Sequence, residues 1–204
     1  MLRVIKKIIM ISFLLIPFST ISAQNSKEIN EIEKQYDQWR TVSKKSDTDI
    51  KRYYELFFGK NYETSIWTDN YLKYEKEIDN FECFIGNEVH LIKNNKLGTM
   101  FKINARTPSG DWEIISDYYY WPTGELFYVF WELFTTSSEH TYRTGEAIIV
   151  SKKLYFNRKG EIIRKSEKVR GVIKNKEIKN QKYEDREVKY WLTLKEVPFN
   201  ELLK

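Results

Sequence analysis

Residues 112–134, WEIISDYYYWPTGELFYVFWELF, and residues 146–164, EAIIVSKKLYFNRKGEIIR, decide the fold of this chain. Each stretch consists of two apolar-rich halves that flank a short polar turn, and each turn is followed by Gly-Glu and two apolar residues. Runs of β-branched and aromatic residues bounded by turn residues are typical of paired strands. The sequence therefore predicts two antiparallel hairpins of similar construction.

The turn residues explain why the two hairpins look alike. Pro122 fixes φ at the second position of a type I turn, and Asn157 at a first position bonds its own backbone ahead. Gly124 and Gly160 can take the left-handed conformation that closes a three-residue hairpin with a bulge. In the first hairpin, this construction pairs residue 121 with 125, residue 120 with 126 and residue 119 with 127. In the second hairpin, it pairs residue 156 with 162 and residue 155 with 163.

The first hairpin is apolar on both predicted faces. One face holds Ile114, Tyr118, Tyr120, Leu126, Tyr128 and Phe130, and the other holds Ile115, Tyr119, Trp121, Phe127, Val129 and Trp131. An antiparallel sheet with one wet side would alternate between apolar and polar residues. We therefore expect either cover on both sides or an exposed aromatic platform, whereas the more polar second hairpin lies nearer an edge.

Helical patterns precede the strands. Ile29, Ile32, Tyr36 and Trp39 recur at helical spacing within residues 25–42, and Ile50, Tyr53, Tyr54 and Phe57 do so before Gly59. Further alternation predicts strands on either side of residues 94–96, with Leu91 opposite Thr99, and a last strand from Val188 to Leu194. The predicted fold class is α+β, with two N-terminal helices packed on a curved antiparallel β-meander. The alternative is a cone like the nuclear-transport-factor-2 fold, with a pocket between helices and sheet.

The repeated unit, two aromatics, three residues, Gly-Glu and two apolar residues, resembles the Tyr-x-x-x-Gly-x-Leu strands of bacterial MORN-like repeat proteins. The resemblance covers about two dozen residues. It implies a scaffold of short strands rather than an activity, because those repeats are mostly scaffolds.

Residues 1–23 have the layout of a secretory signal peptide: Arg3, Lys6 and Lys7, then an apolar run, then small residues ending at Ala23. We expect cleavage there, export to the periplasm or the extracellular space, and a single α+β domain over 24–204. Residues 1–23 hold three of the 34 basic residues and no acidic residue, which leaves 31 basic against 29 acidic. Such a balance does not predict a nucleic-acid partner. We expect no transmembrane helix after cleavage, and the partner to be a protein, a glycan or a cell-envelope component.

Motifs for known chemistries are scarce. The chain has two histidines and one cysteine, so neither a zinc cluster nor an intramolecular disulfide is predicted, and we expect Cys83 to be buried. It contains no nucleophile elbow, no Ser-x-x-Lys and no phosphate-binding glycine loop. We therefore assign no catalytic residue, metal or cofactor.

Three functions stay open. The first is a non-enzymatic binding module, with the candidate ligand-binding residues Tyr118, Tyr120, Trp121, Tyr128, Trp131 and Asp117. The second is a hydrolase or ligand-pocket enzyme with Asp117 and Glu132 in an aromatic cleft, because paired carboxylates beside aromatic rings suit glycosides. The third is a structural envelope protein.

Overall fold

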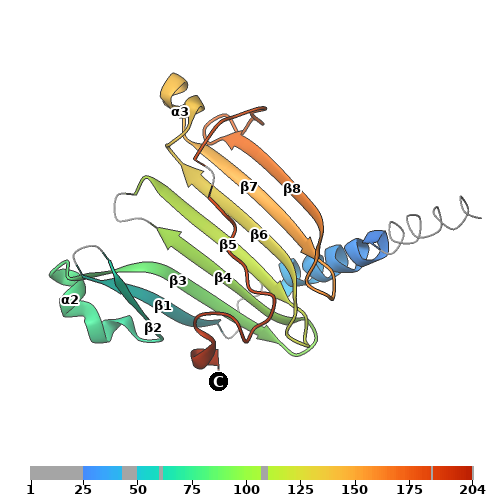
Figure 1. Ribbon diagram of the computed structural model, residues 1–204, viewed down its shortest axis with the longest axis horizontal. Helices are drawn as coiled ribbons and strands as arrows, with labels where there is room; N and C mark the ends of the chain where they lie inside the picture. Colours follow the sequence, from blue (N-terminus) through green and yellow to red (C-terminus); the bar gives the residue numbers. More distant parts are fainter. Residues whose placement is uncertain (1–24, 43–49, 60–61, 107–109, 185, 204) are drawn as a thin grey trace, which may run out of the picture.

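The computed structural model describes residues 25–42, 50–59, 62–106, 110–184 and 186–203. The predicted signal peptide, residues 1–23, lies outside the described residues. The described chain forms one open, twisted sheet with a long helix on one face and an irregular segment on the other (Figure 1). No helix among the described residues is both long enough and apolar enough to cross a bilayer.

Eight antiparallel strands make the sheet in the order β2-β1-β3-β4-β5-β6-β7-β8. Their bounds are β1 Ile50–Phe58, β2 Thr64–Thr68, β3 Cys83–Asn94, β4 Gly98–Arg106, β5 Trp112–Tyr120, β6 Leu126–Thr135, β7 Ile148–Phe156 and β8 Ile162–Gly171. The predicted α+β class with a meander is confirmed, since β3 to β8 follow chain order. The exception is β1, which lies between β2 and β3.

The second predicted helix is wrong: residues 50–58 form strand β1. Side chains alternate across a strand, so Tyr53 and Leu56, three residues apart, point to opposite faces of β1, and both are buried. Apolar residues on both faces of a strand hide the alternation, and their spacing imitates a helical period. The register shift between Glu55 and Leu56 lies in the partner strand, where Gly86 of β3 is the extra residue.

Both look-alike hairpins carry a bulge one position away from the turn. Tyr120 pairs with Leu126 as predicted, but Tyr119 pairs with Tyr128, so Phe127 is the extra residue. In the second hairpin, Phe156 pairs with Ile162 as predicted, whereas Tyr155 pairs with Arg164 rather than with residue 163. Because a one-residue shift inverts every later side chain, the predicted faces of β6 are wrong beyond the bulge.

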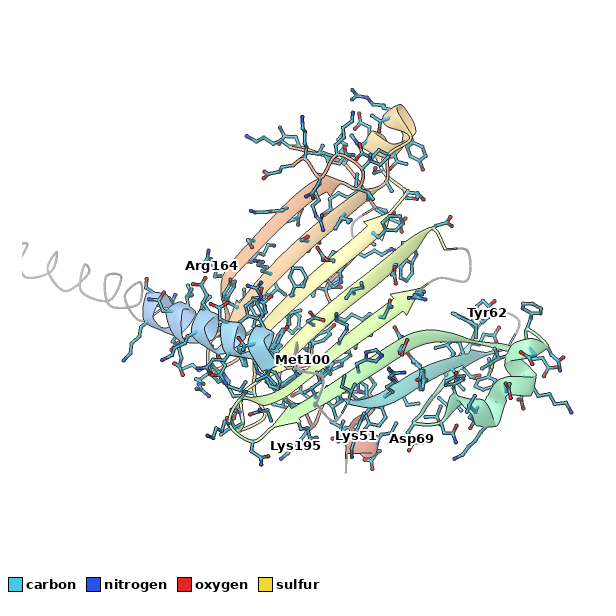
Figure 2. All side chains as sticks on the ribbon, turned by 180° about the vertical axis from the view of Figure 1, so that it is seen from behind. Lys51, Tyr62, Asp69, Met100, Arg164 and Lys195 are labelled. Carbon is cyan, nitrogen blue, oxygen red and sulfur yellow. The ribbon has the colours of Figure 1, made fainter. Side chains whose placement is uncertain are left out.

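One face of the sheet, here called the helix face, packs against the N-terminal helix, residues 25–42. Ile32 and Trp39 of the helix are buried against the sheet. Gln35 donates from Nε2 to the carbonyl of Leu97 at 3.0 Å. The sheet contributes the residues Ile92, Leu97, Met100, Tyr119, Trp121, Phe127, Tyr128 and Tyr155 to this cluster. Figure 2 shows the helix crossing one end of this face.

The opposite face, here called the cavity face, is crossed by residues 186–203, the C-terminal segment. The predicted strand from Val188 to Leu194 is wrong, since this part of the segment makes one isolated bridge, between Thr193 and Glu125. The segment is held by two tyrosines of β5. Tyr118 donates to the carbonyl of Lys189 and Tyr120 to that of Trp191, both at 2.8 Å. A short 3-10 helix, η2 (Asn200–Leu203), follows.

Two buried contacts fix the ends of the sheet. Gly98, with φ of +101°, begins β4 directly against the backbone of the β5–β6 turn. At the other end, Glu146 accepts hydrogen bonds from the backbone N–H groups of Ile173 and Lys174. These bonds lower the pKa of the Glu146 carboxyl, and the bond from Lys174 has the largest effect. Glu146 thereby holds the turn that follows β8, beside the short helix α3 (Glu139–Thr144).

Residues 62–84, here called the arm, extend the sheet at the β2 edge. They contain β2, the 3-10 helix η1 (Tyr71–Tyr74), the short helix α2 (Glu75–Asp79) and the start of β3. Cys83 is buried there as a free thiol, and burial raises the pKa of that thiol. The predicted burial of Cys83 is therefore confirmed.

Candidate functional site

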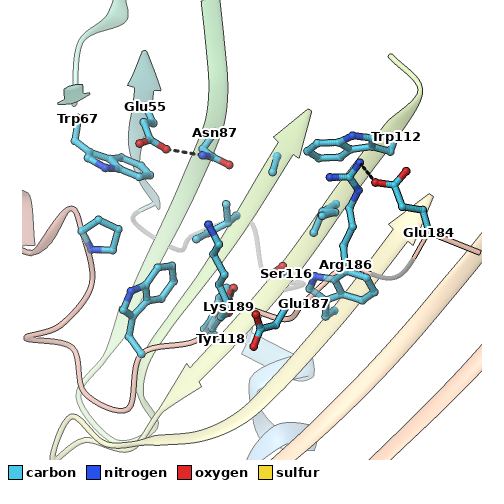
Figure 3. Close-up of a pocket in the computed structure, with 16 residues that line it drawn as sticks. Glu55, Trp67, Asn87, Trp112, Ser116, Tyr118, Glu184, Arg186, Glu187 and Lys189 are labelled. Atoms are coloured by element: carbon cyan, nitrogen blue, oxygen red, sulfur yellow. Dashed lines mark hydrogen bonds and ion pairs between the residues drawn. The ribbon is translucent and has the colours of Figure 1, made fainter. Parts of the chain in front are cut away.

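A cavity of about 600 Å³ lies between the cavity face and the C-terminal segment (Figure 3). Its lining comes from β1 to β6 on one side and from Glu184 and residues 186–198 on the other: Glu55, Trp67, Asn87, Ile103, Ala105, Trp112, Ile114, Ser116, Tyr118, Trp131, Glu184, Arg186, Glu187, Lys189, Trp191 and Pro198. This volume is in the range of small-molecule sites.

The cavity exists because small side chains lie where large ones would fill it. Ala105 of β4 and Ser116 of β5 point to the cavity face between Ile103, Ile114 and Tyr118. Side chains alternate across a strand, so two short residues on neighbouring strands leave a hollow that the flanking residues border. The C-terminal segment closes one side, where the hydroxyls of Tyr118 and Tyr120 hold it.

Four of the six tryptophans of the chain line this cavity. Trp131 is buried in its floor, while Trp67, Trp112 and Trp191 are partly exposed. Trp191 packs against Tyr118, with ring centroids 5.5 Å apart. Such flat, partly exposed rings contribute apolar area at low entropic cost, and their indole N–H groups can still bond to a ligand.

Polar groups stand at two ends of the cavity. At one end, the Glu55 carboxylate accepts from the side chains of Asn87 and Ser65. At the other end, Arg186 donates to Glu184 at 3.0 Å and lies over the Trp112 ring, 4.2 Å from its centroid (Figure 3). Between these two ends, Ser116, Glu187 and Lys189 line the cavity together with the aromatic rings (Figure 3). Aromatic walls interspersed with polar groups suit a ligand that is itself apolar on its flat sides and polar around its rim.

The predicted site residues divide between the two faces. Tyr118 and Trp131 line the cavity, whereas Tyr120 is fully buried on the same face beneath the C-terminal segment. Trp121 and Tyr128 are buried under the N-terminal helix. All five aromatics are core residues, so the exposed platform considered from the sequence is not present at these positions.

The two predicted carboxylates lie on the helix face and do not line the cavity. Asp117 pairs with Lys102 of β4, with 3.7 Å between Nζ and Oδ1, and its side chain is 14% exposed. Glu132 accepts from Ser151 at 2.7 Å and pairs with Arg170. Burial raises the pKa of Asp117 to about 6, against the opposing effect of Lys102.

We expect Asp117→Asn to stabilise the protein at neutral pH. Because the folded-state pKa of about 6 lies above the ordinary value of 3.8, the neutral carboxyl favours folding fully below pH 3.8, and that contribution is lost as the pH rises through 6. The variant should therefore gain on the order of 1–3 kcal/mol of unfolding free energy at pH 7 and much less at pH 4. Urea denaturation at both pH values measures this.

The control for that variant is Asp111→Asn, the same change at an exposed carboxylate. It should change the unfolding free energy by less than about 0.5 kcal/mol at both pH values. The result that would contradict this reasoning is a gain in unfolding free energy over the parent that is smaller at pH 7 than at pH 4. It would mean that burial does not destabilise the ionised Asp117 carboxylate.

Sequence patterns did not single out most of the residues that line the cavity. Trp67, Trp112 and Trp191 lie in three segments far apart in the chain, and the residues of the C-terminal segment come from a part of the sequence interpreted as a strand. The one available signal was the concentration of tryptophan in a small chain. The cone alternative expects a pocket between helices and sheet, whereas this cavity lies on the face away from the N-terminal helix.

Among the described residues, no group of three or more His, Cys, Asp and Glu side chains is arranged so that it could hold a metal ion. Comparison of the chain with protein-family models, with curated proteins and with solved structures finds no significant match.

Proposed function

We propose that the protein is an exported, non-enzymatic binding protein that holds a saccharide in the tryptophan-lined cavity. The observation that carries the proposal is the gathering of four of the six tryptophans around one cavity with polar groups at both ends. Export rests on the signal-peptide pattern of residues 1–23.

A saccharide fits the chemistry of this lining. A pyranose ring has apolar C–H faces that pack on aromatic rings, and hydroxyls around its rim that need donors and acceptors. The partly exposed rings of Trp67, Trp112 and Trp191 supply aromatic surfaces for the apolar faces. Hydrogen-bond donors and acceptors for the hydroxyls come from two pairs, Glu55 with Asn87 and Glu184 with Arg186. A purely apolar ligand would displace water from the carboxylates and the guanidinium without offering them a hydrogen bond in return, which costs free energy.

The alternative is a hydrolase that uses carboxylates of the same cavity. Glycoside hydrolysis needs one carboxyl group as a general acid and a second as a base or nucleophile. Glu55 is engaged by Asn87 and Ser65, and Glu184 by Arg186. These bonds set the positions of both carboxylates, which suits the holding of a ligand, and we therefore favour binding over catalysis.

Tryptophan fluorescence tests the proposal, with the trimers of glucose and of N-acetylglucosamine as probes. We expect at least one trimer to change the emission of the protein in a saturable way. Trp112→Ala should weaken the affinity by about tenfold or more, because it removes one stacking surface worth roughly 1.4 kcal/mol. Tyr142→Ala, an exposed aromatic on α3 away from the cavity, is the control and should bind as the parent does.

Two results would change the interpretation. Saturable binding that Trp112→Ala leaves unaffected would place the ligand elsewhere. Mass spectrometry of the trimers after incubation separates the alternatives, since shortened products indicate a hydrolase, whereas intact trimers support a binding protein.

A further inference from the structure

The end of the arm, around α2, presents apolar side chains to solvent. Phe81 is 93% exposed, and Leu72 and Tyr62 are also exposed. In Figure 2, Tyr62 lies at the far end of the arm, away from the N-terminal helix. Single exposed apolar residues are ordinary, but several at one tip indicate a contact surface.

Phe81 is held in a backbone conformation that favours glycine. It follows α2 with φ of +59°, and its N–H bonds to the carbonyl of Ile78 while that of Glu82 bonds to Glu77. This is a helix C-terminal motif whose left-handed position usually holds glycine. A phenylalanine there costs about 1–2 kcal/mol, and its 93% exposed side chain gains almost no burial against the described residues. A strained, exposed aromatic residue points to a partner that takes up the ring.

The arm is also acidic, whereas the far edge of the sheet is basic. Residues 62–84 hold six acidic and two basic residues, and residues 152–170 of the β7–β8 hairpin hold eight basic and two acidic residues. Four acidic side chains in α2 and just after it form no ion pair with a described residue: Glu75, Glu77, Asp79 and Glu82. Three lysines of the β7–β8 hairpin likewise form no ion pair with a described residue: Lys159, Lys165 and Lys168.

A second cavity, of about 390 Å³, lies at that basic edge. Its apolar lining is Leu154, Ile162, Val188 and Tyr190, and its polar lining is Lys152, Lys165, Ser166, Glu167 and Glu187. Glu167 is engaged by Lys152 and by the hydroxyl of Tyr183. Lys165 therefore borders a hollow of mixed lining, whose apolar side chains can receive a ring carried by an acidic segment.

We propose that the arm of one copy docks at the β8 edge of a second copy, with Phe81 in this second cavity and α2 beside Lys159 and Lys165. The two surfaces belong to opposite edges of one sheet, β2 and β8. One copy cannot join them to each other, so the contact is head-to-tail. The occupant is a second copy because this chain carries both complementary surfaces.

Sedimentation velocity on protein purified from cells that express the full chain tests this contact. We expect the mass to rise above that of a monomer with concentration, and the association to weaken at high salt because charges contribute. Phe81→Gly should weaken association by at least about tenfold. The glycine also relieves the left-handed strain, so a thermal midpoint at or above that of the parent shows that the loss is not due to unfolding.

Matched variants identify the two surfaces. Ile162→Glu and Lys165→Glu should weaken association from the cavity side, whereas Tyr142→Ser and Lys195→Glu, exposed positions outside both surfaces, should not. An equimolar mixture of Phe81→Gly and Ile162→Glu proteins should form a one-to-one pair, because each retains one intact surface.

The proposal is overturned if the parent stays monomeric at all concentrations, if Phe81→Gly associates as the parent does, or if the mixture stays monomeric. Ligand binding in the first cavity involves other residues and is measured on the monomeric Phe81→Gly protein, so the two proposals fail independently.

Discussion

Gly98→Ala is expected to destabilise the protein by more than about 4 kcal/mol, or to prevent folding. A methyl group at residue 98 would lie 2.1 Å from the carbonyl oxygen of Tyr120 and 2.6 Å from the carbonyl carbon of Trp121. Both are backbone atoms of a turn that is itself anchored in the core, so no side chain can rotate away. Urea denaturation of parent and variant measures the change in unfolding free energy.

Gly124→Ala is the matched control, because Gly124 has a similar φ of +97° but open space around the added carbon. It should lose only the conformational advantage of glycine, about 1–2 kcal/mol. The difference between the two variants isolates the backbone contact. Equal losses would show that residue 98 is constrained by its dihedral angles alone.

Phe199→Ala is expected to cost about 3–5 kcal/mol, a large part of the stability of an ordinary domain. The ring is 1% exposed, and its centroid lies 5.1 Å from that of Trp67 and 5.2 Å from that of Phe101. Its removal detaches the end of the C-terminal segment from the sheet and withdraws support from a tryptophan of the cavity. Saccharide affinity should fall together with stability.

Two measurements check this variant. Urea denaturation gives the loss of free energy, and Tyr142→Ala, which removes a ring that is 81% exposed, should shift it by no more than about 0.5 kcal/mol. Hydrogen exchange should be faster at the amide of Leu194, which bonds to the carbonyl of Gly124. Unchanged protection there would mean that Phe199 does not hold the segment in place.

The sequence predicted the hairpins well because their information is local. Pro122, Asn157 and the two turn glycines determine where each hairpin reverses, and the pairs nearest the turns, Tyr120 with Leu126 and Phe156 with Ile162, are confirmed. The turn between β3 and β4 was placed with less success, since Leu91 pairs with Phe101 rather than with Thr99. That error of two residues keeps every side chain on its predicted face.

Apolar side chains on both faces of β1, where Tyr53 and Leu56 are both buried, made that strand look helical. A bulge accounts for the other large error, since the extra residue at Phe127 exchanged the faces of Tyr128, Val129, Phe130 and Trp131. A bulge depends on how two strands meet, which no single segment specifies. The cavity was out of reach for a related reason: its lining unites residues from six strands with a segment whose position depends on two buried tyrosine hydroxyls.

The C-terminal segment also has a consequence for the order in which the molecule assembles. Its bonds to Tyr118 and Tyr53 join residues 71 and 149 positions apart, whereas the hairpins join near neighbours. Closing long loops costs more chain entropy and slows folding. We therefore expect the sheet to form first and this segment to dock last. By the same reasoning it opens at a lower free energy than the sheet, which gives a ligand a route into the cavity while the rest of the fold persists.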